Sequence, residues 1–385
     1  MFINLLQIFI LLSLGAVITL ISTKIFAISA QRAIVLYIWH TFFSFFYSWY
    51  VLNFGGDSTY YYELALENNR DFGFSSLFIV YISSLFFEFA HLSYYSMGIL
   101  FGIFGTIGLL AFDSSLRHVT KDASKKIQLL ATLIVFLPSV SFWSSGIGKD
   151  SICFMAINLI LFASININNR KLILLFGIIF LFLIRPHIAG IMLIALAVTI
   201  LVNKNLNKFK RIILFFVLSI ILIFALPFAL VFVGFDGNLT AENLINFIEG
   251  RQQYNWKNWE GGIDISSMSI SSQIFTYLFR PLPFEAKSFF ALASSFENVF
   301  FIYLFALGLI AKLKYKEVFA HPDLNSFFFL IYSVILLIIL SMSTANLGIS
   351  ARQKWMFLPF LIVLFVSYIA QKKNKHLKVI NFKKL

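Results

Sequence analysis

Two short motifs place an arginine directly before a proline at the end of an apolar segment. They are Arg185-Pro186 and Arg280-Pro281. A proline disfavours helical geometry at the residue before it, so each helix is expected to end at its arginine. The guanidinium group is then held at a helix end, where its planar fork of donors matches a phosphate or a carboxylate. The sequence therefore predicts two fixed anion-binding arginines.

A candidate catalytic carboxylate lies in another polar connection. Asp57 follows Gly55-Gly56, and two glycines allow a ligand or a neighbouring helix to come close to the backbone. We expect Asp57 to act as a general base for a substrate hydroxyl. The alternative interpretation is that Asp57 is the N-cap of the following helix. Asp57, Arg185 and Arg280 are the predicted catalytic residues.

Further ionisable residues are candidates for substrate binding. A Lys–Asp pair begins a predicted helix, where backbone amides and the helix dipole favour anions. Two glutamates are placed to orient the arginines, although an internal ion pair between Arg280 and its neighbouring glutamate is an alternative. A histidine is a candidate acid or base, or a structural residue. These predicted binding residues are Lys149, Asp150, His187, Glu285, Glu297 and Arg352.

The sequence does not favour a metal or a nucleotide. No His/Cys cluster or carboxylate array has the spacing of a catalytic metal site. The segment around Lys149 loosely resembles a phosphate-binding P-loop, but Trp143 stands where that motif needs glycine and Asp150 where it needs serine or threonine. No cofactor is expected.

The composition predicts an integral membrane protein. Of the 385 residues 60% are hydrophobic and only 12% are charged, which excludes an ordinary soluble domain. Apolar segments of about 20 residues, the length that crosses a bilayer core, recur along the chain. The prediction is an all-α, polytopic, single domain over 1–385 with eleven crossings at 3–23, 33–53, 94–112, 127–145, 150–168, 171–185, 187–203, 211–234, 286–311, 324–345 and 354–371.

The distribution of basic residues predicts the orientation. Of 30 Lys and Arg residues, 21 lie in alternate connections, which the positive-inside rule places in the cytoplasm. This topology and anionic lipid account for the net charge of +13, so no nucleic-acid partner is expected. The other nine lie at the opposite face, where an anionic ligand would explain them: Arg70, Lys149, Arg185, Arg251, Lys257, Arg280, Lys287, Arg352 and Lys354.

Two predicted outer segments are longer than simple connections require, at about 54–93 and 235–285. Within the first, the apolar stretch 74–92 contains Glu88 and His91, which are costly at the bilayer centre. We interpret 74–92 as a re-entrant or interfacial helix. Within the second, Leu244 and Phe247 fall on one face of a predicted helix that lies on the membrane.

Several of these motifs together resemble bacterial surface-polysaccharide polymerases of the Wzy type, which extend O-antigen, capsule or exopolysaccharide chains. The similar segments are Gly-Asp-Ser…Tyr-Tyr at 56–62, Phe-Trp-Ser-Ser-Gly…Lys-Asp at 142–150, Ile-Arg-Pro-His at 184–187, Phe-Arg-Pro-Leu-Pro-Phe-Glu-Ala at 279–286, Glu297-Asn298 and Asn-Leu-Gly…Ala-Arg at 346–352.

The resemblance implies a multi-pass protein of the bacterial inner membrane that joins repeat units at its outer face. It implies a polyprenyl-diphosphate-linked glycan as substrate, with the lipid bilayer and other polysaccharide-assembly proteins as partners. A GT-C-type transferase that uses a polyprenyl-monophosphate sugar is one alternative. A lipid-linked glycan flippase or other transporter is another, and it predicts internal repeats that we do not find. A purely structural subunit of such a machinery is a third.

The charge-based topology predicts the outcome of cysteine labelling. In a Cys153→Ser background, Ser266→Cys should react with a membrane-impermeant thiol reagent added to intact cells, because the 235–285 segment is predicted to lie outside. Ser124→Cys should react only after permeabilisation. Labelling of Ser124→Cys but not of Ser266→Cys in intact cells would overturn the orientation.

Overall fold

The fold is described from a computed structural model. It describes residues 2–67, 70–202, 207–235, 240–257, 261–314 and 325–382. Residues 203 and 324, at the ends of two predicted crossings, lie outside these ranges. The chain packs as two compact units, residues Met1–Pro186 (unit 1) and His187–Leu385 (unit 2), which are described separately. The prediction of a single domain over 1–385 stays a prediction.

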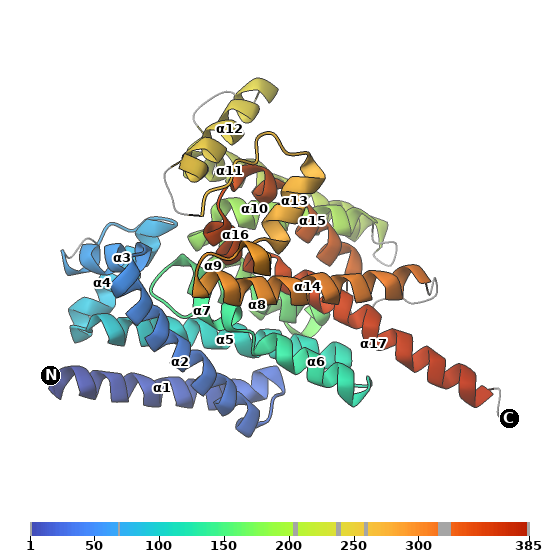
Figure 1. The fold of residues 1–385 in the computed structure, drawn as a ribbon, viewed down its shortest axis with the longest axis horizontal. Helices are drawn as coiled ribbons and strands as arrows, with labels where there is room; N and C mark the ends of the chain where they lie inside the picture. Colours follow the sequence, from blue (N-terminus) through green and yellow to red (C-terminus); the bar gives the residue numbers. More distant parts are fainter. Residues whose placement is uncertain are drawn as a thin grey trace. The chain divides into compact units, whose positions relative to one another are not determined.

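The protein is all-helical, as predicted (Figure 1). Helices make up most of the described residues, and these residues form no strand. The helices of unit 1 are α1 (Phe2–Phe26), α2 (Ala30–Phe54), α3 (Asp57–Leu66), α4 (Ser76–Ala90), α5 (Tyr94–Thr120), α6 (Lys125–Val135), α7 (Pro138–Trp143), α8 (Lys149–Ile165), the short η1 (Ile167–Asn169) and α9 (Lys171–Ile184).

Unit 2 carries the remaining helices. They are α10 (Pro186–Val202), α11 (Lys208–Val233), α12 (Ala241–Lys257), α13 (Ile270–Phe279), η2 (Pro283–Glu285), α14 (Phe289–Lys314), α15 (Ser326–Ser343), α16 (Leu347–Gln353), η3 (Lys354–Met356) and α17 (Leu358–Phe382). α14 packs against α17, and α13 and α17 pack against α15.

A row of glycines on α5 organises unit 1. Helices α1, α2 and α8 all pack against α5 (Figure 1). A side chain at Gly98 or Gly102 would collide with a serine of α2, and one at Gly105 with the backbone that follows α7. At Gly108 it would lie 2.9 Å from the Cα of Met155 on α8. Small residues are the usual means by which membrane helices approach this closely.

The described helices indicate a membrane protein, but they do not confirm about eleven crossings. By length and apolarity, five described helical stretches can cross a bilayer: Phe2–Phe26, Tyr94–Thr120, Lys125–Trp143, Phe289–Leu313 and Ser326–Ser343. Leu347–Met356 and Leu358–Gln371, bent by 65°, make a sixth if they form one broken span. Helix α9 has only 14 residues, which at about 1.5 Å per residue is shorter than a hydrocarbon core of about 30 Å.

The two long segments predicted at the outer face contain helices. The stretch 74–92 forms α4, whose 15 residues are also too short for a simple crossing. Glu88 of α4 pairs with Arg70, with 2.7 Å between Oε1 and Nη2, so this carboxylate has a counter-charge. The 235–285 segment contains α12 and α13. The predicted helix around Leu244 and Phe247 is confirmed as α12.

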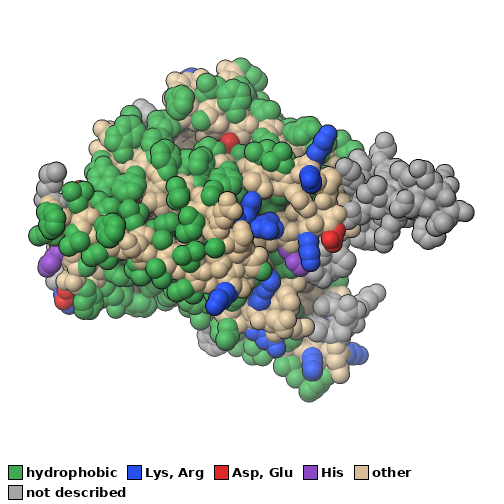
Figure 2. Space-filling view, turned by 90° about the horizontal axis from the view of Figure 1, so that it is seen from below, with side chains coloured by type: hydrophobic (Ala, Val, Ile, Leu, Met, Phe, Trp, Pro, Cys, Tyr) green, Lys and Arg blue, Asp and Glu red, His purple; other side chains and the backbone are tan. Residues whose placement is uncertain are grey.

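The surface agrees with a membrane setting. Figure 2 shows a face on which hydrophobic side chains cover a broad area, while Lys and Arg side chains gather toward one part of it. Among the exposed apolar residues of α1 are Phe2, Phe9 and Ile21, with exposed fractions of 79%, 68% and 62%. Apolar exposure on this scale is unusual for a soluble monomer and normal against lipid.

The glycine row predicts a stability difference between two Gly→Ala variants. Gly108→Ala places a methyl group against the α8 backbone, so the helices must separate, at a cost of about 1–3 kcal/mol. Gly190→Ala in α10 is the matched control, because among the described residues no atom outside the surrounding backbone of α10 lies within 4 Å of the added group. Alanine there should be neutral or stabilise the helix. Unfolding of both variants in mixed micelles measures the difference, and equal stability would contradict the close α5–α8 contact.

Candidate functional site

Arg185 ends α9, as its position before proline predicted. Its backbone N–H donates to the carbonyl of Leu181 at 2.7 Å, and α10 begins at Pro186. The guanidinium Nη2 donates to Oδ1 of Asp150 at 2.7 Å. The Arg185 and Asp150 side chains are 9% and 20% exposed, so this ion pair is largely shielded from water. The helix end thus holds Arg185 in one position.

The start of α8 brings a second cation to the same place. Lys149 Nζ donates to Ser76 Oγ at 3.2 Å, and the Tyr61 hydroxyl lies 3.4 Å from that same oxygen. The start of α4 also meets the end of α9, because the Ser75 N–H donates to the Leu183 carbonyl at 2.8 Å. Four elements therefore build one polar group, which we call the α8 cluster: Tyr61, Ser76, Lys149, Asp150 and Arg185.

Asp57 is an exposed carboxylate one helical turn before Tyr61 of the α8 cluster. It is the first residue of α3, and Gly56 is the N-cap, so the interpretation of Asp57 as the cap is wrong by one residue. Burial raises the pKa of Tyr61; the Ser76 hydroxyl lowers it, and the charges of Asp57 and Asp150 raise it further. Both carboxylates therefore lie close enough to Tyr61 to influence it electrostatically.

In unit 2, Arg280 ends α13 and pairs with Glu285. The backbone N–H of Arg280 donates to Thr276, and its Nη2 lies 2.7 Å from Glu285 Oε1. Glu285 Oε2 also accepts from the backbone N–H of Leu282 at 2.8 Å. Burial alone would raise the pKa of Glu285, but the bonds from Arg280 and Leu282 outweigh it, so the pKa is lowered. The internal ion pair given as an alternative from the sequence is therefore present, and the prediction that Glu285 orients Arg280 toward a substrate stays a prediction.

Glu297 lies close to a lysine that sequence reasoning had not paired with it, and its predicted pairing with one of the arginines stays a prediction. Its carboxylate interacts electrostatically with Lys354, which is 3% exposed. Lys354 Nζ donates to Asn298 Oδ1 at 2.7 Å, and Asn298 Nδ2 donates to the Pro281 carbonyl at 3.1 Å. These bonds join α14 and η3 to the backbone that follows Arg280.

His187 and Arg352 complete the predicted set. His187 is half-buried in the first turn of α10, and Arg352 is half-buried in α16. Both belong to unit 2, as does Arg280, whereas Asp57, Lys149 and Arg185 belong to unit 1. That all of these residues line one cavity stays a prediction.

Sequence reasoning assigned no site role to four polar residues of these two networks: Tyr61, Ser76, Asn298 and Lys354. Lys354 is one of the nine basic residues at the predicted outer face, so the charge distribution had already indicated it as a candidate for anion binding. Asn298 carried a weaker signal, as an amide inside an apolar run. Ser76 begins α4 inside an apolar stretch, and nothing in its sequence context distinguishes it.

The described residues contain no group of three or more His, Cys, Asp or Glu side chains that could hold a metal ion. No protein family, no curated protein and no solved structure matches this chain. The functional argument therefore depends on the chain's own residues.

The shielded Arg185–Asp150 pair predicts a clear stability effect. Asp150→Asn leaves the guanidinium without its carboxylate, so we expect a loss of about 3–5 kcal/mol in unfolding free energy. Glu88→Gln is the control, because the Arg70–Glu88 pair is 47% and 40% exposed and such pairs contribute at most about 1 kcal/mol. Titration of the folded protein with denaturing detergent measures both losses.

A double variant checks that the loss comes from the pair. Arg185→Gln combined with Asp150→Asn should cost clearly less than the two single changes added together, because either change alone already removes the interaction. Additive losses would show that the two side chains stabilise the protein independently.

Proposed function

We propose that the protein is an outer-face membrane glycosyltransferase that polymerises polyprenyl-diphosphate-linked repeat units in polysaccharide biosynthesis. One observation carries the proposal: Lys149 and Arg185, from different helices, belong to one cluster with Tyr61, and the exposed carboxylate of Asp57 lies one turn of α3 before Tyr61. A transferase of this kind needs cations for a leaving diphosphate and a base for an attacking hydroxyl. The α8 cluster with Asp57 supplies both.

The reaction would proceed by displacement at the anomeric carbon of the donor glycan. An acceptor hydroxyl attacks that carbon and gives its proton to the Asp57 carboxylate. The bond from the anomeric carbon to the diphosphate oxygen breaks, and its electron pair leaves with the polyprenyl diphosphate. Lys149 and Arg185 stabilise the added negative charge through charge-assisted hydrogen bonds. Asp150 holds the Arg185 guanidinium in place during this step.

The burial of the arginine supports a positioned role. Arg185 Nε is buried and has no hydrogen-bond partner among the described residues, although Nη2 is bonded to Asp150. An unsatisfied buried donor costs free energy, and such a group in a native structure calls for an explanation such as a role in the site.

The remaining predicted residues belong to unit 2. Under the proposal Arg280 and Arg352 are further diphosphate ligands, Glu285 orients Arg280, and His187 and Glu297 contact the substrate. The proposed setting is the bacterial inner membrane, with about eleven crossings and the active face outside the cytoplasm.

Asp57→Asn is the decisive variant. The amide is nearly isosteric but cannot accept the proton at neutral pH, and the side chain is exposed, so folding should be unaffected. Loss of the general base should lower the rate of glycan transfer by about 10²–10⁴-fold. In a strain that depends on this protein, the surface polymer should shorten or disappear while single lipid-linked units accumulate outside. Glu63→Gln, an exposed carboxylate of the same helix, should leave polymer length unchanged.

The cellular location of the accumulated units separates the candidate functions. Units that accumulate only on the cytoplasmic side would indicate a transporter. Normal polymer from Asp57→Asn would show that this carboxylate is not a base and would remove the basis of the proposal. Lipid-linked monophosphate sugars as the accumulated species would indicate a GT-C-type transferase instead.

A further inference from the structure

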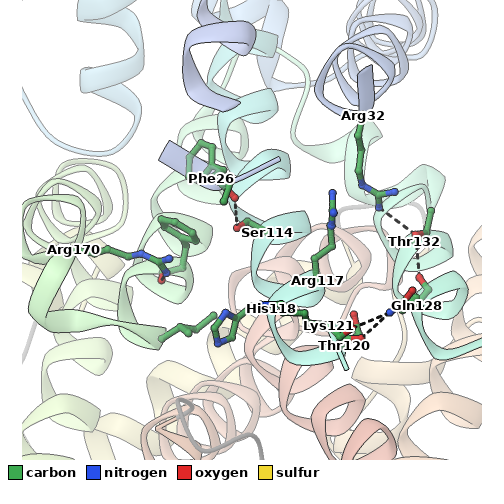
Figure 3. Close-up of a pocket in the computed structure, with 13 residues that line it drawn as sticks. Phe26, Arg32, Ser114, Arg117, His118, Thr120, Lys121, Gln128, Thr132 and Arg170 are labelled. Atoms are coloured by element: carbon green, nitrogen blue, oxygen red, sulfur yellow. Dashed lines mark hydrogen bonds between the residues drawn. The ribbon is translucent and has the colours of Figure 1, made fainter. Parts of the chain in front are cut away.

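Unit 1 has a second polar feature, at the other end of α8. A pocket of about 600 Å³ lies next to the ends of α1, α5 and α8 and the first half of α6. Its walls include Arg32, Arg117, His118, Lys121 and Arg170 (Figure 3). The volume suits a small ligand, since such pockets typically hold about 300–1,000 Å³. α8 has 17 residues, so at 1.5 Å per residue about 25 Å separates the pocket from the α8 cluster.

The walls of this pocket are basic and contain no acidic side chain. Arg32 is neutralised from behind, because its Nε and Nη2 donate to the two carboxylate oxygens of Asp113 at 2.9 and 2.6 Å. Arg117 and Lys121 are both exposed and form no ion pair among the described residues. Figure 3 shows the Arg117 side chain projecting into the space between Ser114 and Thr132.

Arg170 adds a third positive charge without a carboxylate. Its Nη1 donates to the Phe162 carbonyl at 2.7 Å, and its guanidinium carbon lies 3.6 Å from the centre of the Phe162 ring. Burial lowers the pKa of Arg170, because the surroundings disfavour its charged form. A bound anion would relieve that cost.

Helix dipoles do not explain this concentration of positive charge. The ends of α5 and α8 each contribute about half a negative charge, which attracts cations. Arg117, Lys121 and Arg170 have no carboxylate partner among the described residues, and their three positive charges exceed that total. In addition, the carbonyls of Thr120 and Lys121 at the end of α5 already accept from Gln128 Nε2 at 3.3 and 3.1 Å. Lys121 is the C-cap residue of α5, four residues after Arg117, a spacing at which like charges repel. The pocket therefore keeps an excess of positive charge that its own structure does not use.

We propose that this pocket binds a phosphate group, either that of an anionic phospholipid headgroup or that of a free phosphate or diphosphate ion. Basic pockets between membrane helices on the cytoplasmic side are suited to phosphate-bearing headgroups. The site lies at the end of unit 1 whose basic connections are predicted to face the cytoplasm. It is independent of the α8 cluster and of the proposed transferase activity.

The test compares two double variants of the purified full-length chain with equal change in charge. Arg117→Gln with Lys121→Gln removes two pocket cations, whereas Lys125→Gln with Lys126→Gln removes two neighbouring exposed cations that do not line the pocket. One arm titrates phosphatidylglycerol against phosphatidylcholine in mixed micelles. The other titrates inorganic phosphate and pyrophosphate. Thermal stabilisation reports binding in both arms, and size-exclusion profiles confirm that each variant is folded.

We expect the pocket variant to bind the phosphate group at least about tenfold more weakly than the control variant, a difference of about 1.4 kcal/mol. Saturable binding in the lipid arm alone identifies a headgroup as the ligand, and binding in the ion arm identifies a free phosphate. Equal weakening in the two double variants would show only diffuse surface charge and would overturn the site. Absence of binding in both arms would overturn it as well.

Discussion

The close approach of helices to the glycine row of α5 is the constraint on which unit 1 depends. Because Gly98, Gly102, Gly105 and Gly108 have no side chains, α2, the chain after α7 and the part of α8 around Met155 can approach α5 closely. This contact fixes the position of α8 against α5. One end of α8 places Lys149 and Asp150 against α4 and α9, and the other places Phe162 beneath Arg170. A single packing interface thereby positions both polar sites of the unit.

Charge in this protein is concentrated where helices end. Arg185 and Arg280 each cap a helix through the backbone and extend the guanidinium group to a carboxylate. Arg170 bonds a carbonyl of the last turn of α8. An unpaired charge is costly in the middle of a membrane-spanning helix. At the helix ends, charged side chains can bond the backbone groups that have no partner within the helix. A proposed site for diphosphate and a proposed site for a phosphate group at the two ends of α8 follow from the same rule.

Much of the fold and part of the site were predictable from the sequence. Helices occupy all eleven apolar intervals, and the two Arg-Pro motifs end their helices as expected. The number of crossings was not predictable in the same way, because 14 to 17 apolar residues suit either a short crossing or a buried helix. The pairing of Glu297 with Lys354 was also missed, since it joins residues 57 positions apart through packing that local patterns do not encode.

The sequence by itself determined the helical class, the membrane character and the ends of the charged helices, because hydrophobic runs, prolines and glycines act locally on the backbone. Only the tertiary structure decided which charges meet. Arg185 and Asp150 are 35 residues apart, and Lys149 and Ser76 are 73 apart. The basic pocket likewise depends on how the ends of α1, α5 and α8 come together. Which charged residues pair depends on how the helices pack. The same hydrophobic pattern is compatible with several helix arrangements, and the volumes of the side chains select one of them.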